Sequence, residues 1–372
     1  MLRYRDMAIL KIICICGARP NFMKIAPIVD ALAGRGDVDT LLVHTGQHYD
    51  ERMSGLFFED LGLRKPDVDL EVGSGTHARQ TAEIMKRFEP VCVEYAPDWV
   101  VVVGDVNSTI ACALVAVKLG VRVAHVEAGL RSFDRGMPEE INRIVTDSIA
   151  DKLFASEPSG VENLRREGVE EGRIHFVGNV MIDSLLRCRS RADQSTIISK
   201  LELQENNYAL VTLHRPSNVD NPEVFVPILD ALETISRDRR VIFPIHPRSR
   251  KMMGDLNLAS RVEQMAGLRL LEPLGYLDFL KLMSNAAVVL TDSGGIQEET
   301  TILGVPCITL RRNTERPITV SEGTNRLAGV LCEDILEAYH EAMNDTSNRK
   351  EAPLLWDGRA AERIVASLTD SN

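Results

Sequence analysis

Carboxylates that follow apolar segments are the first residues of this sequence that point to chemistry. Asp105 follows the apolar run 100–103 after one glycine, Glu127 follows a second apolar run within HVEAGLR, and Glu139 lies in MPEEINR. Carboxylates gathered at one site supply an acid, a base and stabilisation of developing positive charge. Several negative groups near a bound ligand cost energy unless they act in the reaction, so the three together indicate acid–base catalysis.

Each of these carboxylates also has a simpler, structural explanation when it is taken alone. Asp105 or Ser108 fits the cap of a helix, and Glu139 and Glu140 follow a proline, where acidic residues favour the first helical turn. The local pattern favours the structural explanation for Glu139 and Glu140. Convergence of many ionisable groups at one predicted cleft favours function for the others.

Basic residues follow other predicted strands and provide positive charge for an anionic ligand. GARPNFMK contains Arg19 and Lys24, TLHRP contains His214, and TERP contains Arg316. A lone histidine such as His246, in VIFPIHPRSR, is equally consistent with a structural and a functional use. The net charge of −11 means that any anion must be met by such local groups.

The segment TDSGGIQEE predicts a phosphate-binding turn. Ser293, Gly294 and Gly295 come just before a predicted helix, whose free backbone N–H groups and dipole favour an anion. A tight turn that needs small residues is the alternative. No GxGxxG follows the first strand and no GxxxxGK[ST] occurs, so neither a dinucleotide fingerprint nor a P-loop is supported.

Apolar, β-branched runs alternate with amphipathic segments along the chain, which is typical of parallel βαβ units. We predict an α/β protein of two doubly wound, Rossmann-like domains that face a cleft, because open sheets bind ligands at the carboxyl ends of their strands. A polar stretch separates the halves and predicts domains over 1–185 and 186–356. The strands are expected near residues 9–16, 39–44, 99–103, 121–126, 152–155, 174–177, 208–213, 240–245, 268–271, 286–291, 305–310 and 327–331.

Composition narrows the class of protein. With 44% hydrophobic and 26% charged residues over 372 positions, the chain is expected to be soluble and globular. The negative net charge argues against a nucleic-acid partner. No apolar stretch reaches the roughly 18–20 residues that span a membrane, and Lys11 interrupts the run that would otherwise suggest a signal peptide. The seven scattered cysteines predict a reducing, cytoplasmic setting without disulfides, and they lack metal-ligand spacing.

Eight segments in this order resemble one known family. They are GARPNFMKIAP, GDVNST, HVEAGLRS, MPEEINR, GNVMID, TLHRP, TDSGGIQEE and TERPITVSEGTNRL, and together they resemble the non-hydrolysing UDP-N-acetylglucosamine 2-epimerases. The resemblance implies a glycosyltransferase-B-like fold in which the final helix, about 357–372, packs back onto the first domain. It also implies an isomerase of nucleotide-sugar and polysaccharide metabolism, a homodimer, and no metal or redox cofactor.

The resemblance also implies a reaction and a set of site residues. Family members interconvert UDP-GlcNAc and UDP-ManNAc by eliminating UDP to a 2-acetamidoglucal and adding it back, so a proton leaves one face of C2 and returns to the other. Asp105, Glu127 and Glu139 match the catalytic carboxylates, and His214 matches the essential histidine near the diphosphate. Asn107, Ser108 and Thr109 then start the helix behind Asp105. The residues that match the UDP-sugar site are Arg19, Lys24, Phe279, Ser293, Gly294, Gly295, Glu299 and Arg316.

The sequence departs from the family pattern in three places. After HR, many members carry a glutamate and an asparagine or serine, whereas this chain reads HRPSNVD. Leu274 stands where a relative has glutamine near the uracil. Asp50 replaces a glutamine of the site at which some bacterial members bind a second, activating UDP-GlcNAc. An acidic group near a diphosphate is unfavourable. The other residues that match this activator site are Gln47, His48, Arg215 and His246.

Two other functions fit the same motifs. Relatives that contain GARP and GLRSF epimerise UDP-2,3-diacetamido uronic acids, so the N-acyl sugar is open. A UDP-sugar glycosyltransferase would share the cleft and the UDP site but would need an acceptor. The set of three carboxylates favours epimerisation over transfer.

Overall fold

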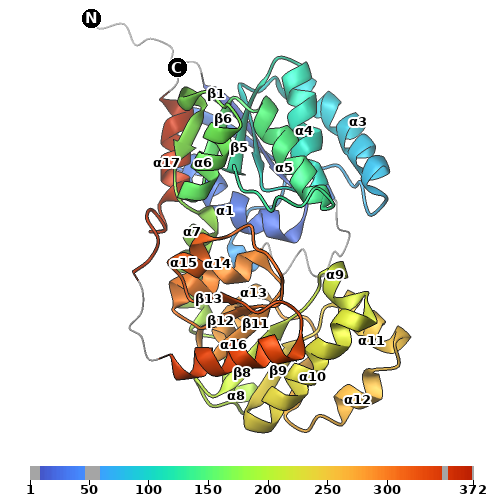
Figure 1. Cartoon of the computed structure of the whole chain (residues 1–372). Coiled ribbons are helices and arrows are strands. Elements are labelled where there is room, and N and C mark those ends of the chain that lie inside the picture. Colours follow the sequence, from blue (N-terminus) through green and yellow to red (C-terminus); the bar gives the residue numbers. More distant parts are fainter. Residues whose placement is uncertain (1–8, 47–58, 346–350, 371–372) are drawn as a thin grey trace, which may run out of the picture. The chain divides into compact units, whose positions relative to one another are not determined.

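The chain forms two compact units, each built around one parallel sheet (Figure 1). The computed structural model describes residues 9–46, 59–345 and 351–370. The described residues up to Arg187, together with those from Leu354 onward, make the first unit, and Cys188–Pro353 make the second. None of the helices in these ranges is long and apolar enough to span a bilayer.

A seven-stranded sheet forms the centre of the first unit, with the order β3-β2-β1-β4-β5-β6-β7 and parallel pairing throughout. Helix α17, near the end of the chain, lies beside α1 in this unit (Figure 1). The elements are β1 (Leu10–Cys16), α1 (Arg19–Ala33), β2 (Val38–His44), β3 (Val68–Asp69), α3 (His77–Tyr95), β4 (Trp99–Val103), α4 (Asn107–Lys118), β5 (Arg122–Ala128), α5 (Pro138–Ile149), β6 (Lys152–Ala155), α6 (Pro158–Arg166), a 3-10 turn (Glu171–Arg173), β7 (Ile174–Phe176), α7 (Val180–Ala192, which runs into the second unit) and α17 (Ala360–Thr369).

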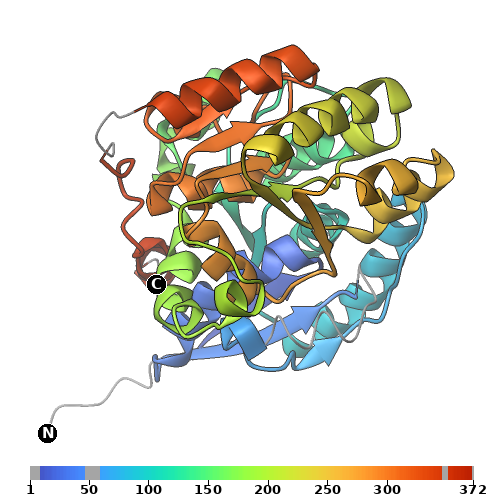
Figure 2. The same ribbon diagram turned by 90° about the horizontal axis from the view of Figure 1, so that it is seen from below.

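A six-stranded sheet with the order β10-β9-β8-β11-β12-β13, again parallel, forms the second unit. Figure 2 shows helices α10 and α16 side by side on this unit. The elements are α8 (Ile197–Lys200), β8 (Tyr208–Thr212), α9 (Pro216–Val219), α10 (Pro222–Asp238), β9 (Arg240–Pro244), α11 (Pro247–Asp255), α12 (Ala259–Glu263), β10 (Leu268–Leu271), α13 (Tyr276–Ser284), β11 (Val288–Thr291), α14 (Gly294–Leu303), β12 (Cys307–Thr309), α15 (Ile318–Ser321), β13 (Asn325–Leu327) and α16 (Cys332–Asn344).

The central strands are mostly apolar because helices cover both faces of each sheet. All five residues of β4 are buried, and those of β11 are buried as well. In the first unit, Val100 and Val102 pack in one core cluster with Ile84 and Phe88 of α3. Continuous rather than alternating apolar runs are the expected signature of parallel strands buried on both sides.

Each sheet has a point where the direction of strand addition reverses, between β1 and β4 in the first and between β8 and β11 in the second. Connections leave neighbouring strands toward opposite sides at such a point and open a crevice at their carboxyl ends. The segments that follow these four strands are those that contain Lys24, Asp105, His214 and Ser293. The topology therefore gathers the predicted residues of each half.

The predicted α/β class with doubly wound parallel sheets is confirmed, and the expected strands differ from the observed ones mainly at the sheet edges. The strand expected near 327–331 lies earlier in the chain, because β13 pairs with Cys307–Thr309 over Asn325–Leu327 and Gly329 then takes a φ of 69°. Ala328 and Val330 are buried in the core beyond the strand. Their apolar character reflects burial of a loop, not pairing. Strand β3 was not predicted, since two residues carry no periodicity.

Candidate active site

The end of strand β5 places Glu127 against Lys24. Glu127 has a φ of 72°, and the pairing of β5 with β6 shifts between Val126 and Ala128, so the strand bulges at this residue. Lys24, in the second turn of α1, lies with Nζ 2.6 Å from Glu127 Oε2, and both side chains are almost fully buried. A non-glycine residue held at positive φ is strained, and such residues concentrate at functional sites.

The end of strand β4 places Asp105 against helix α5. Gly104 turns the chain with a φ of 66°, and a Cβ there would lie 2.9 Å from Lys24 Nζ. The Asp105 carboxylate then reaches Arg143, with 2.6 Å between Oδ2 and Nη1, while keeping 23% of its side chain exposed. Asn142 Nδ2 donates to the Asp105 carbonyl at 2.8 Å. Asp105 is thus fixed at both backbone and side chain yet accessible.

Helix α5 carries two glutamates in addition to Arg143, the partner of Asp105. Glu139 and Glu140 occupy its first turn, as the sequence predicts, and Arg143 is one turn further along. Glu139 is half-buried and forms no ion pair with the described residues. Its spacing of four from Arg143 puts both on one face of the helix. Glu139 is therefore the carboxylate of this helix that remains available to a ligand.

Glu140, by contrast, has a structural role. Its carboxylate accepts from the backbone N–H groups of Ser132 and Phe133, at 3.0 and 2.9 Å, and pairs with Arg143 at 2.9 Å. Burial acts to raise the pKa of Glu140, but these hydrogen bonds and the arginine charge outweigh it and hold the pKa below its usual value. Glu140 thereby holds Phe133 at a φ of 58° and supports the loop that precedes α5.

In the second unit, His214 lies on a buried carboxylate at the end of β11. His214 Nδ1 is 2.8 Å from Asp292 Oδ1, and Asp292 is fully buried. The same carboxylate accepts from the backbone N–H groups of His214 and Arg215 at 3.0 and 2.9 Å. Burial acts to raise the pKa of Asp292, but the histidine and these donors outweigh it and lower the pKa. An ionised Asp292 requires a proton on His214 Nδ1, which leaves Nε2 for a ligand.

Arginines surround a second buried carboxylate, Glu315, beside this histidine. Arg311 lies 2.8 Å and Arg215 3.2 Å from its oxygens. Burial acts to raise the pKa of Glu315, but Arg311, Arg316 and Arg215 outweigh it and hold the pKa far below its usual range. Arg316 itself is buried and pairs with Glu298 at 2.6 Å. The charges of three arginines thus act on one buried carboxylate, and a region so rich in arginine suits an anionic ligand.

The turn predicted to bind phosphate starts helix α14. Ser293 is the N-cap, and Gly294 and Gly295 are the first two helical residues. One turn further along the same helix, Glu299 accepts a hydrogen bond from Tyr276 at 2.8 Å. Burial, with the Glu299 charge and hydrogen bond, raises the pKa of Tyr276 well above its usual value, so the hydroxyl stays protonated. Phe279, on the same helix as Tyr276, is buried.

The residues that match an activator site are only partly described. Gln47 and His48, with Asp50, lie outside the described residues. Arg215 donates to the Asp292 carbonyl at 2.8 Å in addition to its pair with Glu315. His246 caps helix α11 and its ring lies 5.8 Å from that of His214. These contacts account for Arg215 and His246 without a second ligand.

Two residues of the site were not singled out from sequence. Arg143 pairs with Asp105, and Tyr276 donates to Glu299. Arg143 had a signal, since it stands four residues after Glu139 in MPEEINR. Arg19 is the first residue of α1, and its side chain lies outside the described part. Across the described ranges, no cluster of histidine, cysteine or carboxylate residues has the arrangement of a metal site.

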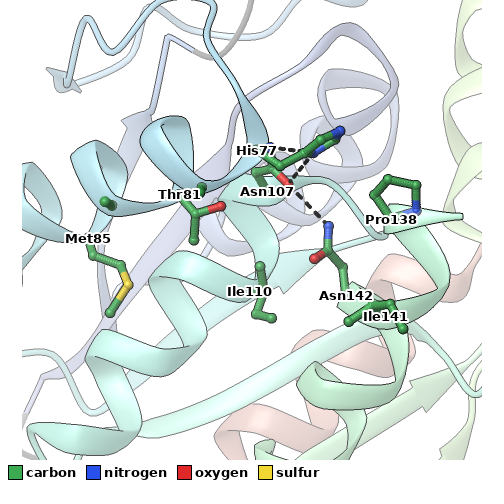
Figure 3. Close-up of a pocket in the computed structure, with 10 residues that line it drawn as sticks. His77, Thr81, Met85, Asn107, Ile110, Pro138, Ile141 and Asn142 are labelled. Carbon is green, nitrogen blue, oxygen red and sulfur yellow. Dashed lines mark hydrogen bonds between the residues drawn. The ribbon is translucent and has the colours of Figure 1, made fainter. Parts of the chain in front are cut away.

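An apolar groove of about 540 Å³ lies beside this site, between helices α3, α4 and α5 (Figure 3). At one end, His77, Asn107 and Asn142 point toward one another, with His77 Nδ1 3.2 Å from Asn107 Nδ2 and Asn142 Nδ2 3.4 Å from Asn107 Oδ1 (Figure 3). The residues that line the rest are mainly apolar: Ala78, Thr81, Ala82, Met85, Ile110, Pro138 and Ile141.

Comparisons with known proteins agree on one family. A family model described as UDP-N-acetylglucosamine 2-epimerase matches residues 30–369. The UDP-N-acetylglucosamine 2-epimerase of Methanocaldococcus jannaschii is 45% identical over 365 residues, which cover 97% of this chain and 99% of the relative. A UDP-2,3-diacetamido-2,3-dideoxy-D-glucuronate 2-epimerase of Pseudomonas aeruginosa is 39% identical, covering 96% and 99%. The crystal structure of the M. jannaschii enzyme in complex with UDP-GlcNAc and UDP matches with a TM-score of 0.91 at 44% identity, covering 97% of this chain and 100% of that one.

Proposed function

Because the chain belongs to the UDP-N-acetylglucosamine 2-epimerase family, we propose that it interconverts UDP-GlcNAc and UDP-ManNAc. The observation that carries this proposal is the pair of carboxylates in the first unit, each held by one buried cation. Asp105 lies on Arg143 and Glu127 lies on Lys24, both at 2.6 Å. Inversion at C2 needs groups that remove a proton from one face of the sugar and return one to the other.

The first step is an elimination. The C1–O bond to UDP breaks and its electron pair leaves with the diphosphate, while the C2 proton passes to a carboxylate and the C2–H electrons form the C1=C2 bond of the glycal. The positive charge that develops at C1 is stabilised by nearby carboxylates. In the return step, a proton reaches the opposite face of C2 and the diphosphate oxygen attacks C1. We assign these roles to Asp105, Glu127 and Glu139.

The second unit is proposed to hold UDP. Its diphosphate would meet the N-terminus of α14, the positive charge of Arg316 and the ring of His214, where the helix dipole and hydrogen-bond donors favour an anion. The carboxylate of Glu299 suits the ribose hydroxyls, and Phe279 suits the face of the uracil. Arg19 and Lys24 are proposed to contact the substrate from the first unit, with Lys24 also orienting Glu127. The two units thus divide catalysis from nucleotide binding.

The decisive experiment follows the proton at C2. UDP-GlcNAc is incubated with the protein in D₂O without any acceptor, and both nucleotide sugars are examined by proton NMR and mass spectrometry. We expect deuterium at C2 of UDP-ManNAc and of recovered UDP-GlcNAc, because one glycal feeds both epimers. Epimer that keeps its C2 proton would exclude the elimination mechanism. UDP release only when an acceptor sugar is added would favour a glycosyltransferase instead.

A second substrate is favoured by one specific observation, the 39% identity to the P. aeruginosa UDP-2,3-diacetamido-glucuronate 2-epimerase. That substrate carries a second acetamido group and a carboxylate, so a competition assay distinguishes the two. Equal concentrations of both nucleotide sugars are supplied, and the initial rates of epimerisation are compared. We expect UDP-GlcNAc to be the faster substrate, and preference for the uronate would reassign the sugar.

We also propose that the protein is a homodimer in the cytoplasm. We assign the surface that a second copy would cover to the apolar groove between α3, α4 and α5. All seven cysteines are free, and all but Cys332 are buried, as suits a reducing compartment. Light scattering after size exclusion should give twice the chain mass. Met85→Glu, in the groove, should give monomer, whereas the matched change Met252→Glu in the second unit should leave the mass unchanged.

A further inference from the structure

A fully buried histidine lies behind the carboxylates of the first unit. His125 is the fourth residue of β5 and its side chain has no exposed surface. Its Nδ1 lies 2.6 Å from Asp147 Oδ1, and its Nε2 lies 2.7 Å from the carbonyl oxygen of Gly104. Both ring nitrogens are therefore within short hydrogen-bond distance of an oxygen.

The identity of these two oxygens determines the protons on the ring. The Gly104 carbonyl is only an acceptor, so Nε2 must donate to it. Asp147 also accepts from the backbone N–H of Gly129 at 3.0 Å and lies 2.8 Å from Arg131, whose positive charge favours an ionised carboxylate. An ionised Asp147 is an acceptor too, so Nδ1 must donate as well. Burial acts to raise the pKa of Asp147, but the charges of His125 and Arg131 outweigh it and lower the pKa.

Arg131 completes the set of charged groups around Asp147. Its guanidinium is almost fully buried, and it also pairs with Glu167, at 2.7 Å. Two cations, His125 and Arg131, thus face two carboxylates, Asp147 and Glu167. The charges balance, which is the condition under which a buried imidazolium is tolerated.

The hydrogen bonds of this pair end on the backbone that carries the catalytic carboxylates. Gly104 directly precedes Asp105, and Gly129 comes two residues after Glu127. Gly129 has a φ of 80°, and a Cβ there would lie 2.2 Å from the Gly160 carbonyl, so this turn is tightly packed. The Gly104 N–H also donates to Val126 at 3.0 Å. His125 and Asp147 therefore connect the turn before Asp105 to the turn after Glu127.

We propose that His125 is held as an imidazolium and, together with Asp147, is a positioning residue that fixes Asp105 and Glu127 relative to each other. This inference rests on the proposed epimerase function. We place neither His125 nor Asp147 in contact with the substrate. Their effect is on the geometry of proton transfer, for which a displacement of about 1 Å can cost on the order of 100-fold in rate.

The first test separates positioning from folding and binding. His125→Gln keeps a donor for the Gly104 carbonyl but turns an amide oxygen toward Asp147, so the two turns lose their link. We expect kcat to fall about 100-fold, with KM within about threefold because the UDP-binding groups belong to the second unit. The matched control His175→Gln, at a half-buried histidine of β7, should keep the parental kcat. A parental kcat in folded His125→Gln would overturn the inference.

The second test is a rescue. In His125→Gln/Asp147→Asn, the asparagine amide can donate to the glutamine oxygen while its own oxygen still accepts from Gly129, so the link is restored without charge. We expect kcat to recover at least about tenfold relative to His125→Gln. Asp147→Asn alone should be less impaired than His125→Gln, because the asparagine amide can donate to Nδ1 of a neutral His125 whose Nε2 still donates to the Gly104 carbonyl. A double variant no better than His125→Gln would show that the link between the turns does not set the rate.

Protonation is tested without activity. In protein labelled with ¹⁵N-histidine, the His125 ring is assigned by its loss in His125→Gln. At neutral pH both of its nitrogens should correlate with a directly bound proton. A single protonated nitrogen would overturn the imidazolium. Absence of epimerisation by the unsubstituted protein would overturn the proposed function and the positioning role with it, while the NMR result would still decide the charge.

Discussion

Lys24 and Glu127 form a buried ion pair that joins helix α1 to the end of strand β5. Nζ lies 2.6 Å from Oε2, and the two side chains are 8% and 4% exposed. A buried pair adds little net stability because both ions lose their hydration. Removal of one partner is far more costly, since the other charge stays buried and uncompensated. This asymmetry makes the contributions to folding and to catalysis separable.

Lys24→Met should lower both stability and activity. It removes the buried positive charge that lies 2.6 Å from the Glu127 carboxylate, so we expect a loss of up to about 3–5 kcal/mol in the free energy of unfolding and loss of turnover. Lys24→Met/Glu127→Gln removes both charges and should recover most of the stability but none of the turnover. Thermal unfolding and a coupled epimerase assay measure the two effects. Recovery of activity in the double variant would contradict a catalytic role for Glu127.

Glu139 and Glu140 are adjacent, but loss of charge should lower activity at Glu139 and stability at Glu140. Glu139→Gln should lower kcat by about 100-fold or more, as for an acid–base group, while leaving the melting temperature unchanged. Glu140→Gln weakens the hydrogen bonds to Ser132 and Phe133 and the pair with Arg143, so it should lower the melting temperature. Each variant is the control for the other. A destabilised Glu139→Gln would indicate that this residue has only a structural role.

Asp105→Asn removes the negative charge that Arg143 faces at 2.6 Å. We expect turnover to fall by about 100-fold or more, with UDP affinity unchanged, because Asp105 belongs to the first unit. Isothermal titration with UDP and the epimerase assay separate the two. Near-parental turnover would remove Asp105 from the mechanism.

UDP affinity should depend on Glu299 more than on Tyr276. Tyr276 donates to the Glu299 carboxylate at 2.8 Å and so orients a group proposed to bind the ribose hydroxyls. We expect Glu299→Gln to weaken UDP binding by about tenfold and Tyr276→Phe by less, since a charged hydrogen bond is worth about 1.5–3 kcal/mol and a neutral one about 1 kcal/mol. Titration calorimetry with UDP and with uridine measures the affinity of each variant. An equal loss for both variants would indicate that the hydroxyl contacts the ligand itself.

The docking of the last helix should weaken as pH rises. Asp183 accepts from the backbone N–H groups of Ala360 and Ala361, at 3.2 and 2.7 Å, where α17 begins. Burial raises the pKa of Asp183 from 3.8 to about 6. The folded state therefore binds more protons between these values, and the contribution of Asp183 is fully present below about pH 4 and lost as pH rises through about 6.

Hydrogen exchange of the α17 amides at several pH values, corrected for the intrinsic rate, measures this effect. The protection of the α17 amides from exchange, expressed relative to that in the Asp183→Asn variant, should fall between pH 4 and 6. Asp357, whose hydrogen bond and ion pair with Arg363 lower its pKa, is the control with the opposite sign. Relative to Asp357→Asn, protection should fall only as pH drops below about 4. The same slope for both comparisons would refute the assignment to Asp183.

Much of the architecture follows from the sequence alone. The runs 99–103 and 152–155 are strands with the predicted bounds, because burial of parallel strands on both faces demands continuous apolar residues. The starts of α4 at Asn107 and of α14 at Gly294 were also predictable, since the turn residues before them are local signals. Glu139 and Glu140 in the first turn of α5 follow the same local logic.

Which charges meet could not be predicted from the sequence alone. Lys24 and Glu127 are 103 positions apart and Asp105 and Arg143 are 38 apart, and no local pattern encodes either distance. The strand order places the ends of β1, β4 and β5 next to one another, and only that order brings these side chains together. For the same reason, sequence could not distinguish available Glu139 from buried Glu140, although they are neighbours in one helix.

The clearest division between the two sources of information is at His125. The sequence determined that it lies in a buried strand, because HVEAGLR continues an apolar run. Only the tertiary structure decided that both of its ring nitrogens face oxygens, one from Asp147 on α5 and one from Gly104 after β4. The charge of a histidine depends on the donors and acceptors that surround it in space, and those come from segments that the chain brings together only when it folds.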